Sequence, residues 1–203
     1  MKYLIAIALG YFLGSSNMAY YIAKCKKADL RSAGSGNLGA SNATILLGWR
    51  AGVTTALHDI GKSALAVLVI RLLFPELEYA PIAAGVASVL GHIFPFYLKF
   101  KGGKGFASYW GMTLALNWKL ALVVGAAIIL VTVITDYIVM GTFTTVISVP
   151  IYMGITKNWL VALLLGIATA VILYKHRENF KRIWKGTEIG VSIMFQKDRR
   201  VKE

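Results

Sequence analysis

Residues 118–136 read WKLALVVGAAIILVTVITD, and no charged side chain lies between Lys119 and Asp136. The hydrocarbon core of a bilayer is about 30 Å thick, which an α-helix crosses with about 20 predominantly apolar residues. Because lipid offers no hydrogen-bond partners, the backbone of such a stretch must satisfy its own polar groups, and a helix does so. The stretch therefore predicts a transmembrane helix.

Further apolar runs lie on both sides of this stretch in the 203-residue chain. The chain is 57% hydrophobic and 15% charged, with a mean hydropathy of +0.64, which is unusually apolar for a soluble domain. We predict an all-α, polytopic integral membrane protein in which residues 1–203 form a single membrane domain. The run at 105–117 is short enough to be a re-entrant or interfacial piece by length alone. The predicted spans are residues 3–23, 50–73, 79–98, 105–117, 118–136, 138–156 and 158–174.

Basic residues between the runs predict the orientation of the chain. The 22 Lys and Arg residues outnumber the 9 Asp and Glu residues, for a net charge of +13. Basic clusters follow the first, third and last runs. Glu76 and Glu78 follow the second run, in a connection on the opposite side of the membrane. Seven crossings place all three clusters on one side, which the positive-inside rule assigns to the cytoplasm. We therefore predict a multi-pass cell-membrane (inner or plasma membrane) protein with its N-terminus outside and a cytoplasmic tail at 175–203. Anionic lipid explains the basic excess without nucleic acid as a partner.

The first polar segment reads GSGNLGASN at residues 34–42. Glycines allow backbone amides to approach a ligand closely, and successive amides can form an anion-binding nest. The literal G-x-G-x-x-G does not indicate a dinucleotide site, because that fingerprint requires a preceding strand and a βαβ unit. The segment predicts an anion site, with a flexible loop as the alternative.

The second polar segment joins GHIFP at 91–95 to KFKGGKG at 99–105. Its last seven residues hold three lysines and three glycines, which combine positive charge with a backbone free to fold around an oxyanion. The spacing is not that of a Walker A loop. The segment favours phosphate binding, with a basic turn that only follows the positive-inside rule as the alternative.

A third polar segment follows the last apolar run. His176, Asn179 and Arg182 are spaced by three residues and would share one face of a helix, and Glu188 lies beyond them. Taken alone, such a segment is more often an amphipathic helix on the membrane surface than a site.

Ionisable residues also lie inside the second predicted span, at His58, Asp59 and Lys62. Charged groups inside a membrane are costly and are usually paired. Asp59 and Lys62 are one helical turn apart, so we expect a structural ion pair, with a proton path as the alternative.

Taken together, these segments resemble the bacterial acyl-phosphate:glycerol-3-phosphate acyltransferases, the PlsY family, across nearly the whole chain. The family pattern S-G-N-x-G-A-[TS]-N is matched at 35–42, and G-H-x-F-P followed by F-K-G-G-K-G is matched at 91–95 and 100–105. The C-terminal pattern H-R-x-N…R…G-x-E is matched at 176–188, and D-x-x-K at 59–62. The resemblance implies that the protein transfers an acyl group from acyl phosphate to the 1-hydroxyl of glycerol 3-phosphate. The products would be lysophosphatidate and phosphate, for phospholipid biosynthesis.

The same motifs imply a site that faces the cytoplasm and needs no metal or nucleotide cofactor. Lysines and glycine amides would meet phosphate charge, serine and asparagine side chains would donate hydrogen bonds, and His176 with Asn179 would orient the acceptor or stabilise an oxyanion. The expected catalytic residues are Lys104, Ser35, His176 and Asn179. The expected substrate-binding residues are Gly36, Asn37, Gly39, Ser41, Asn42, His92, Lys101, Gly102, Gly103, Gly105, Thr142 and Glu188.

Four positions depart from the family pattern, one of them Val139 in place of a serine, so the chain resembles a divergent member or paralogue. An arginine usually follows the first motif by three residues; Ile45 stands there, and Arg31 and Arg50 are the nearby basic residues that could replace it. A basic residue of the relatives is Asp136 in this chain, although Thr142 retains a hydroxyl in the same segment. Gly190 also stands where relatives often have a basic residue.

Two other classes compete with an acyltransferase: a transporter or channel for an organic phosphate, and a non-catalytic paralogue that acts as a membrane partner. The polar segments gather on one face, and no matched pair of broken helices marks a midplane site, which disfavours a transporter. Ile45 and Asp136 keep the non-catalytic class open. Acyl phosphate and glycerol 3-phosphate would be the substrates, and membrane lipids the surroundings.

Overall fold

The computed structural model describes residues 1–193, and helices are the only regular secondary structure within that range. The predicted all-α class is therefore confirmed for these residues. The helices in chain order are α1 Lys2–Ser15, α2 Met18–Cys25, α3 Ala40–Leu47, α4 Trp49–Leu73, α5 Ala80–Ile93, the 3-10 turn η1 Phe96–Leu98, α6 Phe106–Leu116, α7 Trp118–Thr135, α8 Ile138–Thr156, α9 Trp159–Lys175 and α10 Arg177–Trp184.

Asparagine side chains begin three of these helices. The side-chain oxygens of Asn17, Asn117 and Asn158 each accept a hydrogen bond from the backbone N–H three residues ahead, at the starts of α2, α7 and α9. Such caps satisfy amides that have no partner inside the helix. They also separate helices that the apolar pattern alone would run together, since Asn117 divides α6 from α7.

Three helical segments are long and apolar enough to cross a membrane: Ala80–Leu98, Trp118–Thr135 and Ile138–Thr156. A fourth is counted if α9 and α10 form one span with a bend of 46°. Only 17% of α7 is buried in the protein, and its exposed surface is made of residues such as Val123, Ile129 and Val133. An apolar surface of this extent requires lipid or a partner to cover it.

The first predicted span, 3–23, is not a continuous helix. It is broken between α1 and α2, where Ser16 is extended and Asn17 caps α2. The carbonyl oxygen of Ser16 loses its helical partner at the break and accepts a hydrogen bond of 2.6 Å from Lys62 Nζ on α4. A buried polar residue on a neighbouring helix therefore makes the break possible, as backbone at membrane depth requires.

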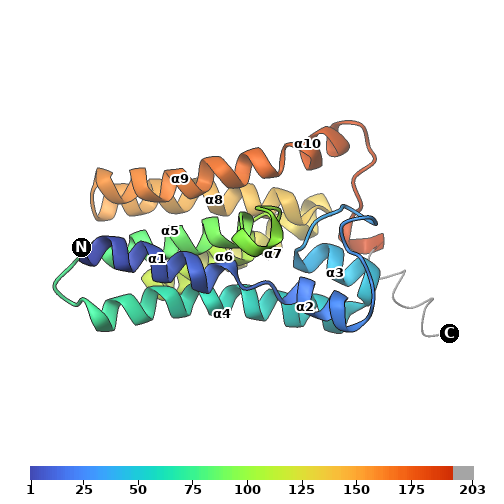
Figure 1. Ribbon diagram of the computed structural model, residues 1–203. Helices are drawn as coiled ribbons and strands as arrows, with labels where there is room; N and C mark the ends of the chain where they lie inside the picture. The colour runs from blue at the N-terminus through green and yellow to red at the C-terminus, as the bar shows by residue number, and fades with distance from the viewer. Residues whose placement is uncertain (194–203) are drawn as a thin grey trace.

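The long helices lie side by side, with α8 and α9 along one face of the bundle and α4 along the other (Figure 1). α5 lies between them and nearly all of its residues are buried. Gly10 and Gly14 of α1 face the backbone of α5 at Ala84 and Ser88, and a Cβ atom at either glycine would overlap it. Gly91 of α5 meets α1 in the same way. This close approach of small residues packs α1 tightly against α5.

The short helices α2, α3 and α10 gather at the end of the bundle opposite the N-terminus (Figure 1). The loop before α3, the loop between α5 and α6, and the turn between α7 and α8 reach the same end. Segments that are distant in the sequence are thereby brought around one cavity.

Candidate active site

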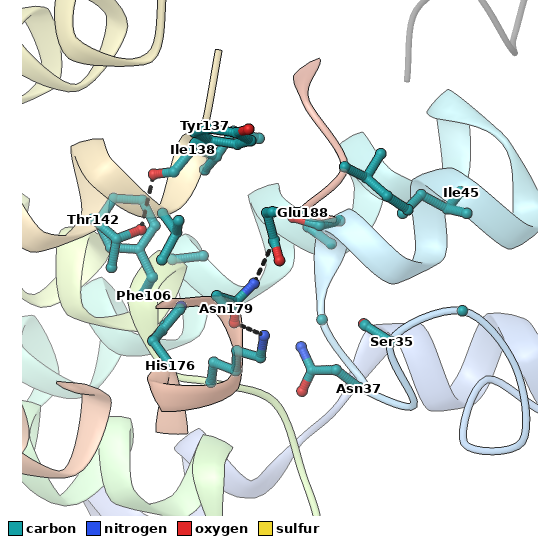
Figure 2. Close-up of a pocket in the computed structure, with 18 of the residues that line it drawn as sticks. Ser35, Asn37, Ile45, Phe106, Tyr137, Ile138, Thr142, His176, Asn179 and Glu188 are labelled. Carbon is teal, nitrogen blue, oxygen red and sulfur yellow. Dashed lines mark hydrogen bonds between the residues drawn. The ribbon is translucent and has the colours of Figure 1, made fainter. Parts of the chain in front are cut away.

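A cavity with a volume of about 280 Å³ lies where these segments meet (Figure 2). It collects residues from the loop before α3, from α5, α6, α8 and α10, and from the segment after α10. All four expected catalytic residues line it. The expected residues found in its wall are Ser35, Asn37, Gly39, Ser41, His92, Lys104, Gly105, Thr142, His176, Asn179 and Glu188.

The loop before α3 is shaped by Asn42, which is fully buried. Its side-chain oxygen accepts a hydrogen bond of 2.9 Å from the Ser35 amide, and its side-chain nitrogen donates one of 2.8 Å to the Leu30 carbonyl. Gly36 turns the chain at φ +65°, a conformation that favours glycine. Asn42 and Gly36 lie outside the cavity wall and hold the loop that presents Ser35 and Asn37. Their contact with substrate stays a prediction.

The loop between α5 and α6 departs further from expectation. The amides of Gly102 and Gly103 donate to the carbonyls of Ile93 and His92, at 3.0 and 3.1 Å. They are therefore not free to bind an anion, and neither residue lines the cavity. A Cβ atom at Gly103 would overlap the His92 ring. The side chain of Lys101 is exposed and also lies outside the wall. Of this loop, Lys104 and Gly105 line the cavity, and phosphate binding by Lys101, Gly102 and Gly103 stays a prediction.

The ion pair expected in α4 is present, and it extends to a third residue. Lys62 Nζ lies 2.7 Å from Asp59 Oδ1, and both residues are buried. The His92 Nδ1 atom lies 2.9 Å from Lys62 Nζ and 3.3 Å from Asp59 Oδ1. His92 and Asp59 also line the cavity. Because its Nδ1 faces this pair, the His92 ring is fixed against Gly103, next to Lys104.

His176 ends α9 and is buried. Its Nδ1 donates a hydrogen bond of 2.9 Å to the Ile172 carbonyl. Burial lowers the pKa of His176 to about 4. The nearby charge of Lys104 also lowers this pKa, whereas the hydrogen bond to Ile172 raises it. At neutral pH the ring is therefore uncharged, with its proton on Nδ1 and an unprotonated Nε2.

A line of polar side chains runs from Lys104 to Arg182. Asn179 Nδ2 donates to Glu188 Oε1 at 2.6 Å (Figure 2). Lys104 Nζ donates to Asn179 Oδ1, and Arg182 Nε donates to Glu188 Oε2 at 2.6 Å. Burial, with a further contribution from the charge of Arg182, lowers the pKa of Lys104 to about 8. Arg182 was not among the expected site residues, although its spacing of three from Asn179 was the signal that could have identified it.

Ile45, at the position where the family usually has arginine, lines the cavity. Neither basic residue considered as a replacement does so. Arg31 Nη2 donates to the carbonyls of Leu98 and Lys101, at 3.1 and 3.0 Å, and therefore fastens one loop to another. Arg50 lies over the ring of Trp49. The structure therefore gives no support to either arginine as the replacement, and Lys104 and Arg182 supply basic groups of the wall.

One part of the cavity wall is apolar and was not foreseen. Its residues come from four separate segments, and none belongs to a polar motif, so the sequence carried no signal that they would meet. They are Phe106, Ala107, Tyr137, Ile138, Val139, Ile189 and Val191, in addition to Ile45. Among residues 1–193, no group of His, Cys, Asp or Glu side chains is arranged to hold a metal ion.

Comparison with known proteins agrees with this arrangement. The profile of the family described as "Glycerol-3-phosphate acyltransferase" matches residues 4–186. The chain is 36% identical to glycerol-3-phosphate acyltransferase 1 of Oceanobacillus iheyensis, over 97% of this chain and 99% of that protein. It is 37% identical to the glycerol-3-phosphate acyltransferase of Coxiella burnetii, over 95% of this chain and all of that protein.

Two crystal structures of PlsY, an integral membrane glycerol 3-phosphate acyltransferase, share the fold. The glycerol 3-phosphate form superposes with a TM-score of 0.87 at 32% identity, covering 94% of this chain and 96% of that one. The lysophosphatidic acid form superposes with a TM-score of 0.85 at 30% identity, covering 96% and 97%. The apolar helices and these likenesses identify a membrane protein, and the chain belongs to the glycerol-3-phosphate acyltransferase family.

Proposed function

We propose that the chain transfers an acyl group from an acyl phosphate to the 1-hydroxyl of glycerol 3-phosphate, forming lysophosphatidate and releasing phosphate. One observation carries this proposal: a single cavity has a basic, hydrogen-bonding part around Lys104 and an apolar part around Ile45 and Phe106. The donor combines a phosphate with a long hydrocarbon chain, and the acceptor is a small dianion. Both kinds of surface are therefore needed in one place.

Lys104, Asn179 and Arg182 are placed to meet the phosphate charge of the substrates. Charge-assisted hydrogen bonds of this kind contribute more than neutral ones. Ser35 and Asn37 supply further polar groups from the facing loop, and Ser41 and Thr142 supply hydroxyls at the same cavity. In this proposal the apolar wall holds the part of the acyl chain next to the reacting carbonyl.

The reaction forms a bond between the acceptor hydroxyl oxygen and the acyl carbon, and it breaks the bond between that carbon and the phosphate oxygen. The hydroxyl proton must leave in the same sequence. His176 Nε2 is unprotonated at neutral pH and can accept it, and the departing phosphate, which is already a good leaving group, can accept it equally. Groups that stabilise charge at the carbonyl oxygen and at the phosphate then supply the acceleration.

The proposal includes an orientation in the membrane: seven crossings, the N-terminus outside, and the cavity open to the cytoplasm. The cavity end of the bundle carries the basic residues of three connections, which supports this orientation. In a Cys25→Ser background, a cysteine at Ser32 or Lys185 should react only from the cytoplasm, and one beside Glu76 only from outside. Labelling of Lys185→Cys from outside would contradict seven crossings.

The direct test uses the purified protein in lipid, with palmitoyl phosphate and glycerol 3-phosphate. Phosphate and lysophosphatidate should appear in equal amounts, without ATP, Mg²⁺ or coenzyme A thioesters. Omission of either substrate is the control. Turnover with palmitoyl coenzyme A alone would show that the donor class is wrong, and absence of turnover with both donors would favour a non-catalytic paralogue.

A further inference from the structure

The segment after α10, residues 187–192, forms one wall of the cavity, and we refer to it as the strap. The chain leaves α10 and runs back toward α3 (Figure 1). Within the strap, Thr187, Glu188, Ile189 and Val191 line the cavity. Glu188 accepts hydrogen bonds from both Asn179 and Arg182. The position of the strap therefore sets the position of Glu188. Glu188 holds Asn179, and Asn179 in turn contacts Lys104.

The strap is fastened at its far end by Asp136, in the turn between α7 and α8. The Val191 amide donates to the Asp136 carbonyl at 2.9 Å. The Ser192 amide donates to Asp136 Oδ1 at 2.9 Å, and the Ser192 hydroxyl donates to Asp136 Oδ2 at 2.7 Å. One residue thus accepts three hydrogen bonds from the strap, two of them through its carboxylate.

Gly190 lies against the same carboxylate. It is buried, and a Cβ atom there would overlap Asp136 Oδ2. The backbone of Gly190 does not adopt a positive φ, so the lack of space beside Asp136 is what requires glycine. Asp136 itself is left-handed at φ +63°, a conformation that Asp and Asn tolerate better than most residues. The left-handed turn at Asp136, its carboxylate and the missing side chain at Gly190 are therefore sterically complementary.

We infer that Asp136 is a positioning residue for the acyl-transfer site: it fastens the strap and so keeps Glu188 on Asn179 and Arg182. Asp136 is absent from the cavity wall, so it acts on the site indirectly. Its effect passes from the strap to Glu188, then to Asn179 and Lys104. The kinetic part of this inference rests on the proposed function; the structural part does not.

Three substitutions separate the contributions of this contact. Asp136→Gly keeps the left-handed turn available but removes both carboxylate acceptors, and it should lower kcat/KM about 5- to 30-fold, the equivalent of one or two lost hydrogen bonds. Asp136→Asn keeps one acceptor and the turn, and it should recover part of that loss. Lys27→Gly is the matched control, because Lys27 is also left-handed but does not line the cavity; its kcat/KM should be unchanged.

A double-mutant cycle tests whether the two residues act together. In the wild type, Gly190→Ala displaces the Asp136 carboxylate and should lower kcat/KM. In an Asp136→Gly background the added methyl meets no carboxylate, so Gly190→Ala should cost little more. Contacting residues show this non-additivity, and independent ones do not. Additive losses would overturn the inference.

A second readout does not depend on turnover. With Cys25 replaced by serine, a cysteine at Ile189 reports exposure of the strap through its rate of maleimide labelling. Asp136→Gly should raise this rate while the thermal midpoint of unfolding stays unchanged, whereas Lys27→Gly should not. Unchanged labelling with unchanged kcat/KM would overturn the inference. Failure of the wild type to turn over, with labelling still accelerated by Asp136→Gly, would count against the proposed function alone.

Discussion

Two glycine-rich loops, 34–39 and 102–105, have similar composition but use their glycines for different purposes. In the first, Gly34 and Gly36 adopt positive φ angles and turn the chain so that Ser35 and Asn37 face the cavity. In the second, Gly102 and Gly103 lie against α5, donate their amides to α5 carbonyls, and leave no room for a Cβ atom. Gly34 and Gly36 thus provide turns in the first loop, whereas Gly102 and Gly103 provide close packing in the second.

This difference shows that a glycine-rich loop with nearby lysines is not by itself a phosphate cradle. Both loops were expected to offer backbone amides to an anion. In the second loop the amides of Gly102 and Gly103 are already used, and the residues of that loop that line the cavity are Lys104 and Gly105. The second loop therefore acts by placing one ammonium group, and its glycines serve that placement.

The largest expected effect tests the packing role of Gly103. Gly103→Ala would drive a methyl group into the His92 ring, which cannot retreat because its Nδ1 faces Lys62 and Asp59. Overpacking costs about 1–3 kcal/mol, and we expect the upper end because the ring cannot move away, so displacement of the loop should lower turnover by about 150-fold. Phosphate release from palmitoyl phosphate and glycerol 3-phosphate measures the loss.

Gly166→Ala is the control for Gly103→Ala, because a Cβ atom at Gly166 in α9 meets no atom within 4 Å. It should retain full activity and stabilise the helix slightly. Near-normal turnover of Gly103→Ala would mean that the second loop is not fixed by close packing against His92.

The next effect concerns Lys104. Removal of its ammonium group takes away a charge-assisted contact worth about 1.5–3 kcal/mol, so Lys104→Ala should lose about 10- to 150-fold in rate. Lys104→Arg should restore part of the activity, because a planar guanidinium differs from a compact ammonium. The same assay measures both variants. Lys119→Ala serves as control, since Lys119 lies at the start of α7 over Trp118 and outside the cavity. Normal turnover by a well-folded Lys104→Ala protein would show that the loop serves only as a membrane anchor.

A smaller effect is expected from pH. The pKa of Lys104 is lowered from 10.5 to about 8, so the ammonium is present below pH 8 and is lost as pH rises through that value. The kcat/KM, which reports the free enzyme, should therefore fall about tenfold between pH 7 and pH 9. Lys104→Arg stays charged across this range and should lack this alkaline decline. An identical pH profile for wild type and Lys104→Arg would assign the decline to another group.

The smallest effect is predicted at Lys101, three residues before Lys104 and in the same loop. Its side chain is exposed and lies outside the cavity, so Lys101→Ala should change kcat/KM by no more than about twofold at physiological salt. A loss as large as that of Lys104→Ala would restore the original expectation that both lysines meet substrate. Comparison of the two variants in parallel assays therefore shows whether the loop presents one ammonium group or two.

Much of the fold follows from local sequence. Helix α7, Trp118–Thr135, lies within one residue of the range predicted from its apolar run, and α8 and α9 lie equally close to theirs. The run at 3–23 was predicted less well, because its break depends on Lys62, which lies 46 residues from Ser16 in the sequence. Apolar composition does not distinguish one continuous helix from two helices whose broken backbone is satisfied by a neighbour.

The sequence by itself determined the membrane-embedded helices, the ion pair of Asp59 with Lys62, and the polar segments that hold Lys104, His176 and Asn179. These depend on hydrophobicity and on spacing within one helix or one motif, which are local properties. Only the tertiary structure decided which of those residues face the cavity, which amides are already paired, and that Asp136 contacts Gly190 and Ser192. The Asp136 contacts join residues more than fifty positions apart. The paired glycine amides depend on how the loop folds back on α5. The packing of separate segments, which no single segment encodes, brings these residues together.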